Sequence, residues 1–405
     1  MSTRRQKQSR FPTGLAKIEV MRLPPIVALT ACMAASAQSI VNNPNRLRNV
    51  IAQLEGALEG EQALRCDVSP TKPTLNYSFR YQAGYVVTVP MNQYLGSGHG
   101  WTMLTRVTPE GGDRKPVYLL ARIPLPRIPK TNVSVNIGGG YLLGEGVYNV
   151  RWMMLDDTGR VCRRNWRTDV HRSRAERIVK VAMPPDTVWE IGLRGARLLP
   201  AGPDDAAALR MTIFLHAAPL FPRRTRMRPN DTVMLMSTVS SLLERVPARS
   251  VRLVLFNLDQ QKELYRKDNF MLQDMVQVSQ AMTNIELGKV DFQVLQNKKG
   301  HVDLLTDLVN REVQEQAPSD VVLFLGPAPR FFDRVPQASL EKPSTGVPQF
   351  YYFQLAPFLL QQQATLTDTI KSTVARLGGK TMVIHTPGDF AKAIDRLEKG
   401  GRGSP

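Results

Sequence analysis

The second half of the chain alternates short apolar runs with segments of helical periodicity, and this alternation constrains the fold more than any other feature. The predicted strands are Met211–His216, Val251–Leu258, Val290–Leu295, Asp320–Leu325, Phe350–Leu355 and Thr381–His385. The predicted helices are Thr232–Arg245, Phe270–Met282, Val302–Glu315, Leu366–Leu377 and one that begins at Thr386-Pro-Gly-Asp389. Nearly continuous apolar strands joined by helices imply a mostly parallel sheet with helices on both faces.

In the first half of the chain, the apolar residues recur at a shorter spacing than in the helices of the second half. From Cys66 to residue 199, apolar and polar residues alternate in runs that end at glycine- and proline-rich turns, a pattern typical of an antiparallel β-sandwich. The predicted strands include Trp101–Val107, Pro116–Ile123, Val133–Ile137, Tyr148–Leu155 and Ile178–Val181. The glycine-rich stretch Gly138–Gly146 lacks the Gly-Lys-Ser/Thr ending of a phosphate loop, so we interpret Gly138–Gly140 as a turn.

These patterns predict five parts of the chain. Residues 1–37 form a signal peptide, 38–65 contain an amphipathic helix over Asn45–Leu64, and 66–199 form the sandwich. The breaker-rich segment Pro200–Asp205 separates the sandwich from the α/β domain at 205–398, and 399–405 is a disordered tail.

The N-terminus predicts export. Basic residues precede the apolar run Leu23–Ala37, which ends in Ala35-Ser-Ala37, a small-x-small end typical of a signal-peptidase site. A second interpretation remains open, because Leu29-Thr-Ala-Cys32 resembles a lipobox and would leave a lipid anchor at Cys32. The run is too short to span a bilayer. We therefore expect a periplasmic or secreted protein that is not membrane-spanning.

Cleavage after Ala37 leaves two cysteines, Cys66 and Cys162. An even number of cysteines in an exported chain predicts one disulfide bond between them. The alternative is a pair of buried thiols. Neither cysteine has a second cysteine at CxxC spacing, which argues against redox catalysis and a zinc site.

The charge of the chain favours anionic partners. The formal net charge is +18, and the first 22 residues contribute only +5 of it. Arginines gather in two stretches, whose predicted patch residues are Arg163, Arg164, Arg167, Arg223, Arg224 and Arg226. Arginine beside an aromatic residue such as Trp166 suits phosphate or acidic polysaccharide. The alternative is a set of solvated turns. No nucleic-acid-binding motif is present, so nucleic acid is not an expected partner.

The region of about residues 205–398 resembles a von Willebrand factor A-like (vWA-like) domain, specifically the divergent, secreted bacterial proteins described as VWFA-related. The resemblance rests on the order and length of the predicted strands and on Val321-Val-Leu-Phe-Leu-Gly326, which stands where the family has its fourth strand. A generic Rossmann-like sheet fits the same pattern, and both alternatives remain open.

The resemblance also implies that this chain lacks the cation site of the family. In the family, the first strand runs into Asp-x-Ser-x-Ser, whose oxygens hold a divalent cation together with a later Thr and Asp. The matching positions here are His216, Ala218, Leu220, Gly300-His301 and Leu325-Gly326. Mg²⁺ requires hard oxygen ligands. We therefore expect no metal at this site and no cofactor.

From the resemblance we expect an exported, non-enzymatic binding or scaffold protein of the cell envelope, which contacts another envelope or extracellular protein. Open parallel sheets bind ligands at the carboxyl ends of their strands. The predicted contact surface at that edge is His216, Ala218, Pro219, Asp259, His301, Gly326 and Pro327.

Three alternatives stay open. His216, His301 and Asp303 would suit a softer transition metal if the fold brought them together. The second alternative is an enzyme that acts on an envelope polymer at the interdomain cleft. Against it, Asp259 and Asp333 are lone carboxylates and no known catalytic motif is present. The third is a binder of acidic glycans that uses the arginines of residues 163–177.

Overall fold

The computed structural model describes residues 38–43, 45, 48–56, 62–111, 115–191, 209–221, 224–283, 285, 292–315, 319–341, 348–357 and 367–401, and these belong to one compact unit. The predicted signal peptide with Cys32, and the predicted boundary at Pro200–Asp205, lie outside these residues. Within them, no helix is long and apolar enough to cross a membrane.

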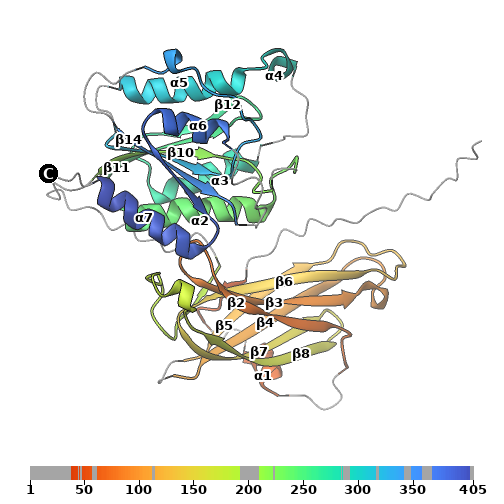
Figure 1. Cartoon of the computed structure of the whole chain (residues 1–405). Helices are drawn as coiled ribbons and strands as arrows, with labels where there is room; N and C mark the ends of the chain where they lie inside the picture. Colours follow the sequence, from red (N-terminus) through yellow and green to blue (C-terminus); the bar gives the residue numbers. More distant parts are fainter. Residues whose placement is uncertain are drawn as a thin grey trace, which may run out of the picture. The chain divides into compact units, whose positions relative to one another are not determined.

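The first half forms two antiparallel sheets (Figure 1). The first sheet has the order β1 (Ser39–Ile40), β5 (Val117–Pro124), β4 (Gly100–Pro109), β7 (Gly146–Asp156) and β8 (Val161–Val170). The second has the order β2 (Asp67–Leu75), β3 (Tyr81–Pro90), β6 (Ser134–Leu143) and β9 (Val188–Glu190). The ring of Tyr85 in β3 lies 5.2 Å from that of Trp152 in β7, so buried aromatic side chains fill the space between the sheets. The predicted strand at Ile178–Val181 is wrong, because these residues lie in a turn and bend.

The predicted turn at Gly138–Gly140 is also wrong, because these glycines lie inside strand β6. Their lack of side chains lets β3 and β6 approach closely. A Cβ atom added to Gly84 of β3 would lie 2.1 Å from the carbonyl oxygen of Gly139. Alternation alone could not separate a glycine-rich strand from a turn, since only the neighbouring strand creates the need for glycine.

The predicted helix at Asn45–Leu64 is shorter than expected. Helix α1 spans Arg48–Glu55, and its Val50 and Ile51 pack against Leu104 and Met153 on the outer face of the first sheet. Farther along, the backbone N–H of Leu64 donates to the carbonyl of Val161 at 2.9 Å, so the chain has left the helix and joined the sheet.

The second half forms a mixed six-stranded sheet (Figure 1). Its order is β12 (Lys262–Lys267), β11 (Ala248–Asn257), β10 (Leu209–His216), β13 (Val321–Gly326), β14 (Gln349–Leu355) and β15 (Lys380–Ile384), and only β12 is antiparallel to its neighbour. Helices α2 (Pro229–Arg245), α3 (Met275–Thr283) and α7 (Pro387–Gly401) pack on one face. Helices α5 (Gly300–Gln314) and α6 (Thr369–Arg376) pack on the other. The expectation of a helix-covered, mostly parallel sheet is confirmed.

Three details differ from the sequence-based expectations for this half. The predicted strand Val290–Leu295 is wrong over its described part, since Phe292–Gln296 forms helix α4. Strand β12 is not predicted by the sequence, because it is charged and shows no apolar run, and an edge strand tolerates such residues. Helix α7 continues to Gly401, so the predicted tail at 399–405 begins too early, and residues 402–405 lie outside the described part.

The turn between β2 and β3 joins the two halves through buried contacts. Phe79 is fully buried and stacks on Phe390 of α7, with ring centroids 5.5 Å apart. Beside it, Arg80 forms an ion pair with Glu244 of α2 at 3.2 Å, and the hydroxyl of Tyr77 donates to a backbone carbonyl at 2.9 Å. The sandwich and the α/β lobe therefore share one continuous hydrophobic core.

Candidate functional site

The residues predicted as a contact surface gather at the carboxyl edge of the mixed sheet. Strands β10 and β13 end at His216 and Gly326, and they are adjacent in the sheet although β11 and β12 lie between them in the sequence. The strand order changes direction between β10 and β13, which is the position where open sheets commonly bind ligands.

Most of these side chains are buried. His216 is 1 % exposed, and its Nδ1 lies 3.0 Å from the carbonyl oxygen of Pro327. Burial lowers the pKa of His216, so its imidazole is neutral at pH 7. Ala218, Pro219 and Gly326 are buried as well, whereas Asp259 is half-buried and lies 3.9 Å from the guanidinium of Arg330. That this edge contacts a partner stays a prediction.

His301 lies in the first turn of α5 and is 2 % exposed. Its Nε2 lies 2.9 Å from a carboxylate oxygen of Asp333, and its ring stacks on Phe331 at 4.0 Å. Asp303 instead accepts a hydrogen bond from the side-chain amide of Asn297 at 3.2 Å. Among the described residues, no group of three or more His, Cys, Asp or Glu side chains could hold a metal ion. The transition-metal alternative at His216, His301 and Asp303 is therefore not supported.

The predicted disulfide bond is confirmed. Cys66, just before β2, is bonded to Cys162 of β8, with Cα atoms 6.3 Å apart. The bond crosses from the second sheet to the edge strand of the first. Such bonds persist in oxidising compartments.

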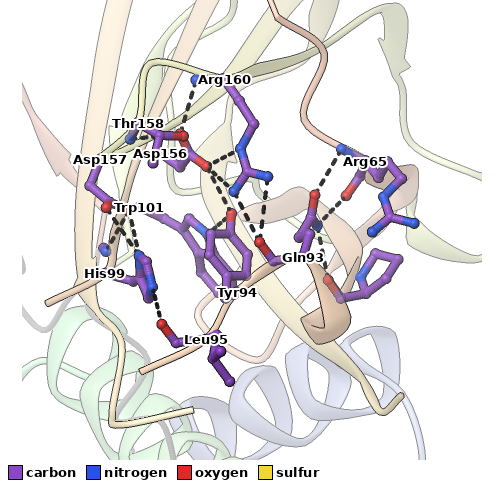
Figure 2. Close-up of polar contacts among 12 residues, drawn as sticks. Arg65, Gln93, Tyr94, Leu95, His99, Trp101, Asp156, Asp157, Thr158 and Arg160 are labelled. Atoms are coloured by element: carbon purple, nitrogen blue, oxygen red, sulfur yellow. Dashed lines mark hydrogen bonds and ion pairs between the residues drawn. The ribbon is translucent and has the colours of Figure 1, made fainter. Parts of the chain in front are cut away.

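A polar network holds the turn of the β7–β8 hairpin (Figure 2). The buried Asp156 carboxylate accepts hydrogen bonds from the backbone and side chain of Thr158 and from Arg160, while the hydroxyl of Tyr94 donates to it at 3.3 Å. Tyr94 in turn accepts from the indole N–H of Trp101 at 2.8 Å. Both carboxylate oxygens are satisfied from within the chain, so the network is structural.

The predicted basic patch is divided between two elements. Arg163, Arg164 and Arg167 lie on β8, where strand alternation puts Arg164 on the face opposite the other two. Arg224 and Arg226 lie between β10 and α2, and Arg223 lies outside the described residues. The guanidinium of Arg224 stacks on Phe221 at 3.9 Å, and Arg226 is exposed. That these arginines bind an anionic partner stays a prediction.

Two other arginines join the β8 residues on the outer face of the first sheet. Arg106 of β4 lies directly opposite Arg151 of β7, and Arg151 lies opposite Asn165 of β8. An open groove of about 460 Å³ has the polar lining Arg106, Thr108, Asn149, Arg151 and Asn165, completed by Val150 and Trp166. The sequence contained a signal for this polar face, because polar residues alternate with apolar ones in both β4 and β7. Only the register shows that the arginines meet.

One end of the groove is flanked by an ion pair. Arg167 donates two hydrogen bonds to the Glu110 carboxylate, at 2.9 and 3.0 Å. The hydrogen bond from Arg167 is the main reason that the pKa of Glu110 is lowered. Toward α1, Arg163 donates to the carbonyl of Gly56 at 3.0 Å. The groove therefore lies between the Glu110–Arg167 pair and the surface covered by α1.

The sequence matches no family model and no curated protein. A point mutant of the minor pilin PilB from Streptococcus sanguinis is 8% identical, with a TM-score of 0.25 over 78% of this chain and 91% of that one. A protein designated ApaA from Bordetella pertussis is 12% identical, with a TM-score of 0.20 over 28% of this chain and 99% of that one. A β-glucuronidase of Bacteroides uniformis is 8% identical, with a TM-score of 0.18 over 77% of this chain and 38% of that one. Scores this low carry no inference about fold or function.

Proposed function

We propose that this chain is an exported, non-enzymatic binding protein of the cell envelope that takes an anionic ligand on the outer face of its five-stranded antiparallel sheet. The observation that carries the proposal is the groove in which Arg106 and Arg151 lie opposite each other. The disulfide bond supports export, because such bonds form in oxidising compartments.

The physical argument is electrostatic. Guanidinium groups bind anions through charge-assisted hydrogen bonds. The net charge of +18 adds a long-range field that attracts anions toward the surface.

The test is salt-dependent retention of the purified full-length chain on a heparin matrix. The double variant Arg106→Gln/Arg151→Gln should elute at clearly lower salt than the wild type. The matched control is Arg122→Gln/Arg127→Gln, which removes the same charge from exposed positions outside the groove. Equal losses in both variants would mean that net charge alone causes retention, and the proposal would then be wrong.

We also propose, as a second function, that the α/β lobe is vWA-like and contacts a partner protein without a cation. The change of strand direction between β10 and β13 supports this arrangement, as does the absence of oxygen ligands at His216, Ala218 and Leu220. If a partner is identified by crosslinking, its affinity should be the same in EDTA and in magnesium, and should fall when exposed residues around Asp259 are substituted. A partner that requires magnesium would contradict the proposal.

A further inference from the structure

We propose that two loops at one end of the sandwich dock on an anionic lipid bilayer, with Leu95 and Val133 entering the headgroup layer and Arg127 and Lys130 contacting lipid phosphates. The loops are Leu95–His99 and Leu125–Val133, and together we call them the tip surface. This surface is separate from the groove between Arg106 and Arg151, so the proposal does not depend on the groove.

The two loops lie side by side at the end where strands β3 and β5 finish. The backbone N–H of Gly96 donates to the carbonyl of Ile128 at 2.9 Å, and Ile128 donates back to Gly96 at 2.6 Å. The turn that contacts the α/β lobe through Phe79 precedes β3, at the other end of that strand. The tip surface and the contact with the α/β lobe therefore lie at opposite ends of β3.

Two apolar side chains of the tip surface face solvent. Leu95 is 70 % exposed and Val133 is 60 % exposed. Moving an exposed apolar side chain out of water and into the boundary of a bilayer is favourable. Because both side chains belong to loops, they can enter the headgroup layer while the strands and the core of the sandwich stay intact.

Contacts within the chain hold the loops in shape (Figure 2). The ring of His99 places Nε2 at 3.0 Å from the carbonyl oxygen of Leu95 and Nδ1 at 3.1 Å from the carboxylate of Asp157. In the second loop, Pro126 and Pro129 restrict the backbone. Loops that already have a fixed conformation lose little conformational entropy when they dock.

The charge of the tip surface is complementary to anionic lipid. Neither loop contains an aspartate or a glutamate. Arg127 and Lys130 are exposed, and within the described part of the chain neither forms an ion pair. Basic side chains at the surface of an anionic bilayer are attracted to its headgroups, and nearby apolar side chains add to the binding.

A bilayer suits this surface better than a partner protein does. A stable protein interface needs about 1,000 Å² or more of complementary area. The tip surface instead offers two apolar side chains on different loops, and the groove of the sandwich is lined by other residues. A fluid headgroup layer accommodates single side chains without a matching shape.

The experiment is co-sedimentation of residues 38–405 with lipid vesicles. Residues 1–37 are left out because their apolar run Leu23–Ala37 would bind lipid by itself, and the chain from Gln38 onward belongs to one compact unit. The vesicles contain either phosphatidylglycerol and phosphatidylcholine in equal parts or phosphatidylcholine alone. The protein should bind the mixed vesicles and should not bind phosphatidylcholine alone.

One variant tests the apolar contact. Leu95→Ser/Val133→Ser should weaken binding to the mixed vesicles at least tenfold, because it removes both apolar side chains. The matched control is Ile178→Ser, which replaces a side chain of the sandwich that is 56 % exposed and lies outside the tip surface. This control should bind as the wild type does.

A second variant tests the charge. Arg127→Gln/Lys130→Gln should weaken binding by about twentyfold, since each basic residue near an anionic bilayer contributes about fivefold. The matched control Arg249→Gln/Lys392→Gln removes the same charge from exposed positions of the α/β lobe and should bind nearly as the wild type does. Unchanged thermal unfolding of each variant excludes misfolding as the cause of a lost affinity.

Three outcomes would overturn the proposal. The first is equal binding to both kinds of vesicle, and the second is an equal loss in either variant and its control, which would mean that hydrophobicity or net charge in general drives binding. The third is no binding to any vesicle, which would leave a partner protein as the occupant of the tip surface. None of these results bears on the groove, because retention on heparin tests Arg106 and Arg151.

Discussion

Arg106 in β4 and Arg151 in β7 occupy directly opposite positions in an antiparallel register on one face of a sheet. Their neighbours two residues away, Leu104 and Met153, are buried under helix α1 on that same face. Within a few residues, the same face of the sheet therefore changes from an apolar area covered by helix α1 to an open groove with charged side chains. That change makes the groove a bounded site.

The disulfide bond should be a major source of stability. It closes a loop with a sequence separation of 96 residues between Cys66 and Cys162. In the chain-entropy model such a loop contributes about 4–5 kcal/mol to the free energy of unfolding. Reduction should lower the urea midpoint accordingly. The same reductant should leave a Cys66→Ala/Cys162→Ala variant unchanged, and equal midpoints for oxidised and reduced wild type would disprove the prediction.

Phe79 should couple the folding of the two lobes. Phe79→Ala removes a fully buried ring that stacks on Phe390, and should cost about 3–5 kcal/mol. Because this contact lies in the shared core, calorimetry should resolve two unfolding transitions in the variant where the wild type has one. Phe332→Ala is the matched control, since that ring is 53 % exposed and should change the stability by less than about 0.5 kcal/mol. A single, barely shifted transition in Phe79→Ala would contradict the shared core.

Asp156 should support the hairpin at neutral pH and lose this effect in acid. Burial acts to raise the pKa of Asp156, but hydrogen bonds from Thr158 and Arg160 lower it below its usual value. The contribution of Asp156 to the free energy of unfolding is therefore present above about pH 4. It is lost as the pH falls through the lowered pKa of the folded state. Asp156→Ala should cost about 3 kcal/mol at pH 7 in urea unfolding, with a smaller cost in acid. Asp157→Ala, in the same turn but exposed, should cost much less.

Asp368 should have the opposite pH dependence. Burial raises the pKa of this carboxyl to about 6, because its hydrogen bonds from Lys371 and Gln354 do not replace lost solvation. The folded state then holds a proton that the unfolded state has released, so stability falls as the pH rises from about 4 to about 6.

The variant Asp368→Asn keeps a capping side chain and removes the charge, so its stability relative to the wild type should grow by up to about 3 kcal/mol between about pH 3.5 and about pH 7. Urea titrations at both pH values measure this difference. Asp395→Asn, at an exposed position on α7, is the matched control for the Asp-to-Asn change itself. A flat difference for Asp368→Asn would show that its carboxyl is not held protonated.

Divalent cations should not stabilise the protein. If the α/β lobe is vWA-like, as we propose, its cation positions are His216, Ala218 and Leu220, whose side chains supply no hard oxygen ligand. The thermal midpoint should therefore be the same in millimolar magnesium, manganese or EDTA, because only ligands that bind the folded state raise it. A rise in magnesium that is lost in EDTA would mean that other residues supply a site.

Local patterns in the sequence were enough to predict several features. The β/α alternation predicted the helix-covered parallel strands, because period and apolar character are properties of each segment alone. The pair Cys66–Cys162 was predicted by counting the cysteines that follow the predicted signal peptide. In contrast, the charged edge strand Lys262–Lys267 and the glycine-rich strand β6 are not predictable in this way, because their structures depend on neighbouring strands.

By itself, the sequence determined which segments form strands and helices over most of its length, and it predicted which two cysteines pair. The tertiary structure alone decided that Phe79 lies in a core shared by both lobes, that His216 is buried, and that Arg106 meets Arg151. The physical reason is that periodicity acts over a few neighbouring residues. The register between strands, and thus the grouping of charges on a surface, arises from contacts between residues that are distant in the chain.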